Sequence, residues 1–366
     1  MTRTRPSPWR AAILAPMSAA DTGSHLVALA SIEAARARLV GRIARTPMLT
    51  STTAARWATA AYREGPGTDV RLADQRLYLK ADHLQKTGSF KTRGMTNRIL
   101  TLQPEARERG AITLSAGNAG QAYAWAGSSA GVPVTVVMPE GAVRAKVDAC
   151  LAYGARVVLH GAHVGETFAE MERIRDAEGL TFVHPFDDPE VIAGHGSLGL
   201  ELVEDVPDVD VVVVGVGGGG LISGVAAAVK GRRPSCRVYG VEPDGSNAMS
   251  LAMDRNEIVT IDPISVADGL GAPFAGRWTL AMCRALLDGI VLLDDSTILA
   301  GVRFGLERLK QLLEPAGAAA LAAVLAGRVP IADGDRVAVV LSGGNVAVDR
   351  LSDLLEPAAT LPGARA

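Results

Sequence analysis

The chain has 366 residues, of which 48% are hydrophobic and 21% are charged, and its formal net charge is −2. This length and apolar content suit one large domain or two ordinary domains with a sizeable core. The near-balance of charge argues against nucleic acid or an acidic membrane surface as the main partner. The three cysteines, Cys150, Cys236 and Cys283, are far apart and form no CxxC pair. They indicate a reducing cytoplasm rather than a disulfide framework.

The first 26 residues differ in texture from the rest of the chain. They combine basic residues with Pro, Ser and Ala, and their apolar run AAILAPM is short and interrupted by Pro16. A secretory signal peptide needs a longer uninterrupted apolar stretch. We therefore expect residues 1–26 to be a disordered tail, or translation to begin at Met17. The sequence contains no run of about 18 apolar residues, so it predicts no membrane-spanning helix.

From residue 27 onward, short apolar segments alternate with helical patterns. Fully apolar strands separated by helices predict a parallel sheet covered on both faces. The expected strands are 77–81, 111–116, 133–139, 155–161, 181–186, 209–217, 236–243 and 336–344. Residues 61–76 are polar and contain Gly and Pro, which indicates a surface loop.

The spacing of these strands suggests two domains. Three strand–helix units follow one another closely between residues 111 and 187 and could form a small sheet of their own. We expect a small α/β domain over residues 113–187. The large domain would then contain residues 27–112 and 188–355.

A glycine loop lies in VDVVVVGVGGGGLISGVAAAVK, between a predicted strand and a predicted helix. Backbone amides of such a loop and the start of the helix form a phosphate cradle. Gly215, Gly217 and Gly220 also satisfy G-x-G-x-x-G, and Glu242 follows about 20 residues later. Taken alone, this stretch predicts a dinucleotide-dependent oxidoreductase.

Lysine is rare in this chain, with six lysines against 31 arginines, yet two lysines lie in LQKTGSFKTRG. A lysine becomes a nucleophile when burial or a neighbouring cation keeps its amine neutral. Lys91 follows Phe90 at a predicted turn into a helix, whereas Lys86 lies in a polar run typical of a surface. Two other polar loops, LSAGNAGQ and LSGGN, also follow strands, where ligands of open α/β sheets bind.

Eight motifs appear in a fixed order: LQKTGSFKTRG, SAGNAGQ, PFDDPEVIAGHGSLG, VGVGGGGLISG, GVEP, ADGLG, EPAGAAALAA and LSGGN. In this order the chain resembles the serine/threonine dehydratases, pyridoxal-phosphate enzymes of the tryptophan synthase β-like fold type II. The resemblance covers about residues 30 to 350 and implies two open twisted α/β domains with the cofactor between them. It replaces the dinucleotide interpretation, because the glycine loop then holds the phosphate of pyridoxal 5'-phosphate. The family usually forms homodimers.

The resemblance also implies roles for individual residues. Lys91 would be the Schiff-base lysine and the base that removes the substrate α-proton, with Phe90 beside the cofactor ring. Asn118 would bind the 3-hydroxyl of the ring, and Ser342 the pyridine nitrogen, where a neutral hydroxyl favours elimination. The other cofactor residues would be Gly217, Gly218, Gly219, Gly220, Leu221, Gly269 and Glu314. The residues that would hold the substrate are Ser115, Ala116, Gly117, Asn118, Ala119 and His195.

The implied reaction removes water from a threonine- or serine-like β-hydroxy-α-amino acid and gives a 2-oxo acid and ammonia. Two departures leave the substrate open. Ala119 stands where the family usually has His, so the pocket is wider and could admit a modified substrate such as hydroxyaspartate or phenylserine. His195 stands where Gln is common, and it is either a core residue or a contact to a polar substrate group.

Other activities fit less well. Ala116 stands where the racemase branch often has a serine as second base, which disfavours a racemase, and a β-replacement synthase stays open. Glu242 could bind a divalent cation, but Ala248 replaces the expected aspartate partner. Outside this fold, the alternatives are a dinucleotide-dependent oxidoreductase and a non-catalytic amino-acid sensor; the presence of Lys91 and Ser342 argues against a sensor.

Overall fold

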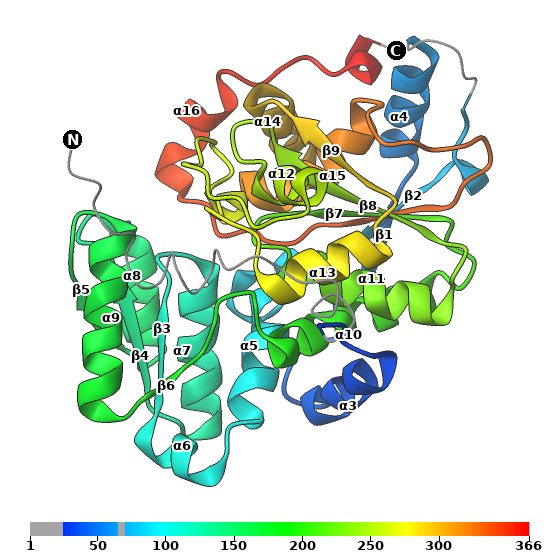
Figure 1. Cartoon of the computed structure of the whole chain (residues 1–366). Helices are drawn as coiled ribbons and strands as arrows, with labels where there is room; N and C mark the ends of the chain where they lie inside the picture. The colour runs from blue at the N-terminus through cyan, green and yellow to red at the C-terminus, as the bar shows by residue number, and fades with distance from the viewer. Residues whose placement is uncertain (1–24, 65–69, 366) are drawn as a thin grey trace.

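The computed structural model describes residues 25–64 and 70–365, so nearly all of the predicted N-terminal tail lies outside the described residues. The framework consists of a six-stranded sheet and a separate four-stranded sheet, each with its own helices (Figure 1). This arrangement confirms the predicted α/β fold class with two open sheets. The exact domain boundaries stay a prediction.

The large sheet has the strand order β1-β2-β10-β7-β8-β9. All neighbours are parallel except β1 and β2, which are antiparallel. The strands are β1 (Met48–Ser51), β2 (Leu77–Lys80), β7 (Val211–Gly215), β8 (Arg237–Pro243), β9 (Gly289–Leu293) and β10 (Val337–Val340). Strands β7 and β10 are buried throughout, because helices cover both faces of the sheet.

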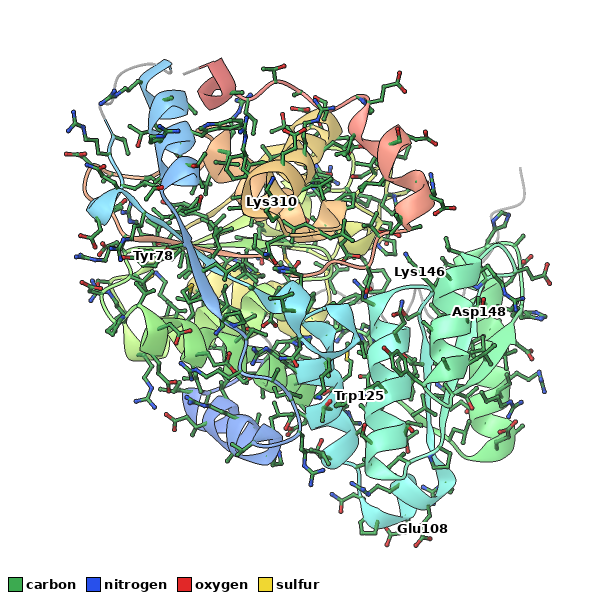
Figure 2. All side chains as sticks on the ribbon, turned by 180° about the vertical axis from the view of Figure 1, so that it is seen from behind. Tyr78, Glu108, Trp125, Lys146, Asp148 and Lys310 are labelled. Carbon is green, nitrogen blue, oxygen red and sulfur yellow. The ribbon has the colours of Figure 1, made fainter. Side chains whose placement is uncertain are left out.

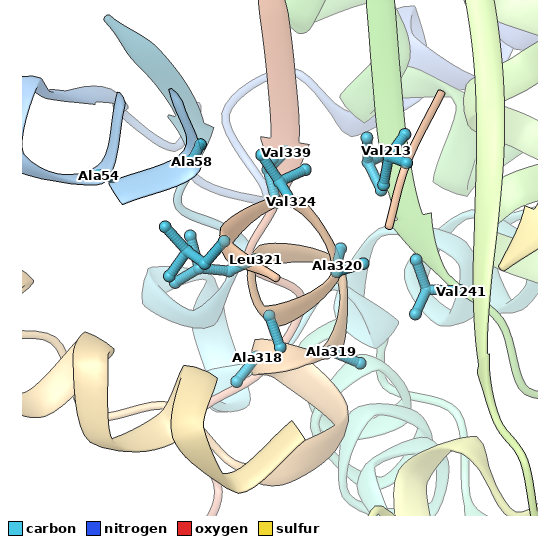
Figure 3. Close-up of a cluster of buried hydrophobic side chains, with 14 of the residues drawn as sticks. Ala54, Ala58, Val213, Val241, Ala318, Ala319, Ala320, Leu321, Val324 and Val339 are labelled. Carbon is cyan, nitrogen blue, oxygen red and sulfur yellow. The ribbon is translucent and has the colours of Figure 1, made fainter. Parts of the chain in front are cut away.

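One face of this sheet packs on α4 (Thr52–Glu64), α14 (Asp295–Phe304) and α15 (Pro315–Leu325). Figure 3 shows the small side chains of α15 between the sheet and α4. The opposite face packs on α10 (Pro189–Asp205), α11 (Gly220–Arg232), α12 (Ala248–Arg255) and α13 (Arg277–Leu286). The remaining helices outside the small sheet are α3 (Leu29–Leu39), α5 (Lys91–Leu100), α6 (Pro104–Arg109) and α16 (Leu351–Leu355).

The small sheet is entirely parallel and has the order β5-β4-β3-β6. Its strands are β3 (Ala111–Leu114), β4 (Val134–Met138), β5 (Arg156–Leu159) and β6 (Thr181–Phe182). On one side lie α7 (Asn118–Ala130) and α8 (Arg144–Ala152), and on the other side lies α9 (Val164–Glu178). Because β3 and β6 are neighbours, the loops that follow them meet at one edge of the sheet.

All the expected strands are represented, but the expected strand 181–186 shrinks to β6 at Thr181–Phe182. Two further details of the sequence prediction are wrong. Strand β9 was not among the expected strands, although its sequence GIVLL is a continuous apolar run; it forms one edge of the sheet and is only partly buried. Residues 61–64 were expected in a loop, yet they complete α4. Ala61 and Tyr62 are buried, and the Tyr62 hydroxyl donates a hydrogen bond to the Val329 carbonyl at 2.6 Å. In the part of the chain that the structure describes, no helix has the length and apolar character needed to cross a membrane.

A buried ion network fixes the helix that begins with Lys91. The Arg93 guanidinium, with no exposed surface, donates to both carboxylate oxygens of Asp82 at 2.8 and 2.9 Å. It also donates to both oxygens of Glu201 at 2.7 and 2.9 Å. Lys80 lies 2.9 Å from Glu201 and 3.1 Å from Asp205. The network therefore connects β2, α5 and α10, and its bidentate geometry offsets the cost of burying the charges.

We expect R93M to lower the free energy of unfolding by about 3–5 kcal/mol, because the Asp82 carboxylate would stay buried without its cation. Urea unfolding followed by circular dichroism measures this change. A matched control is R156M, which removes an exposed pair with Glu178 at 2.9 Å and is expected to cost less than about 1 kcal/mol. Equal costs for the two variants would contradict a structural role for the buried network.

Candidate active site

A cavity of about 730 Å³ lies between the two sheets, at the carboxyl ends of their strands. Ligands of open α/β sheets bind at this edge. The cavity brings together residues that are up to 252 positions apart in the sequence, from Phe90 to Ser342. The predicted site residues on its wall are Phe90, Lys91, Ser115, Ala116, Gly117, Asn118, Ala119, Gly217, Gly218, Gly219, Gly220, Leu221, Gly269, Glu314 and Ser342.

Lys91 is the first residue of α5, and its side chain extends into the cavity. Its Nζ donates a hydrogen bond to the Pro185 carbonyl at 2.8 Å. Burial lowers the pKa of Lys91 to about 8. At this pKa about a tenth of the amine is neutral at pH 7 and about half at pH 8, and the neutral form is the one that acts as a nucleophile or a base.

The loop after β10 holds the segment that leads to Lys91. The Phe90 amide donates to the Ser342 carbonyl at 3.0 Å, and the Gly344 amide donates to the Gly88 carbonyl at 2.9 Å. Gly88 has φ +72°, and a Cβ there would lie 2.3 Å from Asn345 Oδ1. Only glycine fits this close approach without strain. The SGGN loop and the TGSFK segment thus form one unit, which places Ser342 and Lys91 on the same wall.

The glycine loop leads from β7 into α11, and Gly219 adopts a left-handed conformation with φ +86°. No side chain caps the start of this 13-residue helix, so its first amides are available for an anion. A Cβ on Gly218 would lie 2.4 Å from the ring of Phe186. The loop is therefore a close-packed cradle lined by backbone, and it fits the phosphate of pyridoxal phosphate.

Asn118 and Glu314 connect the two sides of the cavity. Asn118, at the start of α7, donates through Nδ2 to Glu314 Oε1 at 2.7 Å, and its Oδ1 accepts from Asn345 Nδ2 at 2.8 Å. Burial, followed by the charge of Asp268, raises the pKa of Glu314 to about 8. Lys146 of α8 pairs with Asp268 at the cavity wall, and Figure 2 shows Lys146 where the small sheet's helices face the rest of the molecule.

The predicted substrate loop, Ser115 to Ala119, follows β3 and lies along the cavity. Among the described residues no side chain caps the start of α7. The Gly117 amide donates to the Ser115 hydroxyl at 3.2 Å, so the amides of Asn118 and Ala119 are the ones available here. Such amides at the N-terminus of a 13-residue helix suit a carboxylate.

His195 is the predicted substrate residue that the structure does not place on the cavity wall. It is fully buried in α10, its Nδ1 accepts a hydrogen bond from the Gly94 amide at 3.1 Å, and its ring packs edge-on against Phe90 with a centroid distance of 4.8 Å. This side of α10 faces α5 rather than the cavity. The prediction that His195 contacts the substrate is therefore wrong. His195 is a core residue, as the alternative prediction had it, and it packs against Phe90 on the side away from the cavity.

Glu242 is buried, and its carboxylate accepts hydrogen bonds from the amides of Met249 at 3.0 Å and Ser250 at 2.9 Å. Burial raises the pKa of Glu242 to about 8. Because the carboxylate caps α12, it is not free to bind a ribose hydroxyl, as the dinucleotide interpretation required. Among the residues that the structure describes, no group of three or more His, Cys, Asp or Glu side chains could hold a metal ion.

Sequence reasoning assigned no role to the segment after β6, although it contributes a whole wall of the cavity. His184, Pro185, Phe186 and Asp187 all line it. The available signal was the motif itself, a short strand followed by HPFDD at the same edge as the SAGN loop.

The fold places a half-buried lysine and a glycine loop that fits a phosphate in one cavity between two α/β sheets. The family model "Pyridoxal-phosphate dependent enzyme" matches residues 61–343. The chain therefore belongs to the pyridoxal-phosphate dependent enzymes, and its cofactor is pyridoxal phosphate.

Individual relatives are similar over most of the chain. The L-threonine ammonia-lyase of Thermotoga maritima is 44% identical over 274 residues, which cover 74% of this chain and 68% of that relative. The catabolic L-threonine dehydratase of Escherichia coli K12 is 40% identical over 272 residues, which cover 74% of this chain and 83% of that relative. Among solved structures, maize serine racemase superposes with a TM-score of 0.82 at 32% identity and covers 89% of this chain and 96% of that one.

The low pKa of Lys91 predicts how the protein without cofactor captures pyridoxal phosphate. The neutral amine is the reactive form, and its fraction rises with pH until it exceeds one half above pH about 8. We expect the capture rate to rise up to pH about 8 and then level off. With an ordinary pKa of 10.5 the rate would still rise steeply at pH 9. Borohydride trapping followed by mass spectrometry of the Lys91 peptide measures the rate, and K91R is the control.

The tight packing of the cradle predicts a second effect. We expect G218A to raise the dissociation constant for pyridoxal phosphate roughly 5- to 150-fold, because overpacking costs about 1–3 kcal/mol. Equilibrium titration by cofactor absorbance measures it. The matched control is G141A, where an added Cβ meets no atom within 4 Å. Unchanged affinity in G218A would show that the cradle does not bind the phosphate.

Proposed function

We propose that this protein is an ammonia-lyase that removes water from L-threonine, and also from L-serine, to give a 2-oxo acid and ammonia. The observation that carries the proposal is the shared cavity of Lys91, the glycine cradle and Ser342. The two relatives described above, at 40% and 44% identity, are named for this activity on L-threonine.

When bound, pyridoxal phosphate supplies the electron sink that makes the substrate α-proton acidic enough to remove. The amides of residues 217–221 would hold its phosphate, Asn118 would bind the 3-hydroxyl of the ring, and Ser342 would bind the ring nitrogen. Ser342 is 5% exposed, and among the described residues its neutral hydroxyl donates one long hydrogen bond, at 3.5 Å to the Ala316 carbonyl. Such a hydroxyl can bind the pyridine nitrogen without forcing it to take up a proton.

Lys91 would act as the base. Its Nζ lies at the cavity wall, and its pKa of about 8 suits a group that accepts a proton from the α-carbon and releases it again. The amides at the start of α7 would hold the substrate carboxylate. This orients the α-hydrogen toward the lysine and the β-carbon toward the wall that follows β6.

A racemase is an alternative that the fold permits, because maize serine racemase has the same fold. Racemisation needs a second acid–base group opposite Lys91. Ala116, at the place where the racemase branch often has a serine, has no proton to give.

A second alternative is an elimination on another substrate. A lyase for hydroxyaspartate or phenylserine stays possible because Ala119 widens the pocket. A β-replacement synthase has no feature of the cavity in its favour.

The proposal predicts that the holoenzyme releases 2-oxo acid and ammonia in equal amounts from L-threonine or L-serine. Coupled dehydrogenase assays on L- and D-threonine, L- and D-serine, hydroxyaspartate and phenylserine measure this release. K91A is expected to lower kcat by about 10²–10⁴-fold or more, since it removes the base together with the covalent anchor. Faster release from hydroxyaspartate or phenylserine would transfer the proposal to that substrate, and racemisation without release would overturn it.

We further propose a homodimer in the cytoplasm. The family resemblance supports the dimer, and the three free, buried cysteines support a reducing compartment.

A further inference from the structure

His184 is a polar side chain within a run of aromatic rings on the cavity wall. Its ring lies edge-on to Phe186 at a centroid distance of 4.5 Å and to Phe182 at 5.8 Å. Phe186 in turn lies 5.8 Å from Phe274. All four side chains line the cavity. A substrate group that faces these four rings meets carbon, except where it meets the imidazole nitrogen of His184.

The loop after β6 fixes which ring nitrogen of His184 carries the hydrogen. Nδ1 accepts hydrogen bonds from two backbone amides, of Phe186 at 3.2 Å and of Asp187 at 2.7 Å. An accepting Nδ1 has no hydrogen, so the neutral ring carries it on Nε2. Burial, followed by the charge of Lys91, lowers the pKa of His184 to about 3, so the ring stays neutral near pH 7. Within the described residues, no protein group forms a hydrogen bond with Nε2.

The backbone at His184 and Pro185 is bonded both to Lys91 and to α7, the helix that begins in the predicted carboxylate loop. The carbonyl of the next residue, Pro185, accepts the hydrogen bond from Lys91 Nζ at 2.8 Å. The carbonyl of His184 itself accepts from the Tyr123 hydroxyl of α7 at 2.9 Å. A substrate whose carboxylate is held at the start of α7 and whose α-carbon faces Lys91 brings its β-carbon to this wall.

We propose that Nε2–H of His184 donates a hydrogen bond to the β-hydroxyl oxygen of the bound substrate, while the surrounding rings contact the β-methyl group. The contact rests on the proposed function and identifies the residue that selects β-hydroxy amino acids. Its donor is a neutral imidazole, so it orients the leaving oxygen and transfers no proton.

Two unreactive amino acids test this contact without turnover. 2-Methylserine and 2-aminoisobutyrate both lack an α-hydrogen, and they differ only in the hydroxyl group. Binding to the holoenzyme is followed by the change in cofactor absorbance. We expect the wild type to prefer 2-methylserine by about 2- to 12-fold, the ratio that corresponds to a neutral hydrogen bond of 0.5–1.5 kcal/mol.

Two substitutions separate the two nitrogens of the ring. In H184N the amide oxygen takes the place of Nδ1 and keeps the loop contacts, whereas the Nε2 donor is lost. In H184Q the amide nitrogen takes the place of Nε2. We expect H184N to bring the affinity ratio to about 1 and to lower kcat/KM for threonine, and H184Q to keep most of the preference. H160N, at a histidine outside the cavity lining, should match the wild type.

The outcomes distinguish this contact from the function itself. A ratio that H184N leaves unchanged would overturn the contact, as would equal binding of both compounds by the wild type. If H184N does not hold cofactor, the ratio in H184Q decides, and loss of the preference there overturns the assignment. A wild type that prefers 2-methylserine but releases no 2-oxo acid supports the contact and refutes the proposed lyase reaction.

Discussion

The bidentate pairing of Arg93 with Asp82 and Glu201 is the interaction on which the position of the reactive lysine depends. Arg93 lies two residues after Lys91 in α5, and its two carboxylate partners come from the segment after β2 and from α10. A planar guanidinium that is held on two sides leaves the first turn of α5 little freedom to rotate. On the other side, the loop after β10 binds the backbone just before Lys91. The lysine therefore extends from a rigid turn rather than from a free loop.

Burial in the cavity shifts the pKa values of three titratable side chains toward their neutral forms. Burial lowers the pKa of Lys91 to about 8 and that of His184 to about 3, and it raises the pKa of Glu314 to about 8. Each shift favours the neutral form of the group, because burial penalises charge of either sign. The charges of the phosphate and of the substrate carboxylate would then be balanced mainly by backbone amides at two helix N-termini. Such dipoles are fixed before a ligand arrives, so they need little reorganisation.

Much of this site could be predicted from the sequence, because short motifs encode backbone geometry. The four glycines after β7, the SAGN loop and the SGGN loop require particular local conformations, and the structure brings all three to the cavity with Lys91. The fold class followed from apolar strands that alternate with helices. Strand β9 was missed although its sequence GIVLL is a continuous apolar run like those of the predicted strands, and its place as the edge strand beside β8 is visible only in the structure.

Other parts depend on tertiary contacts that no local pattern records. His195 has the chemistry of a substrate ligand, but whether position 195 of α10 faces α5 or the cavity depends on how the helix packs. His184 was overlooked because the sequence does not show that the pairing of β6 with β3 brings this segment to the cavity, although the amides that bond its Nδ1 are only two and three residues away. Asp82 and Glu201 are 119 positions apart, and the sequence around them does not indicate that both pair with Arg93.

The contacts that cross the cavity have a thermodynamic consequence. Asn118 binds Glu314 and Asn345, and Lys146 pairs with Asp268, so helices of the small sheet hold on to loops of the large one. A ligand that touches both walls adds to the same set of connections. The affinity for such a ligand is then coupled to the contacts that set the spacing of the two sheets. Substitutions that break these cross-cavity contacts would therefore lower the affinity for such a ligand, and the bound ligand would in turn make the contacts harder to break.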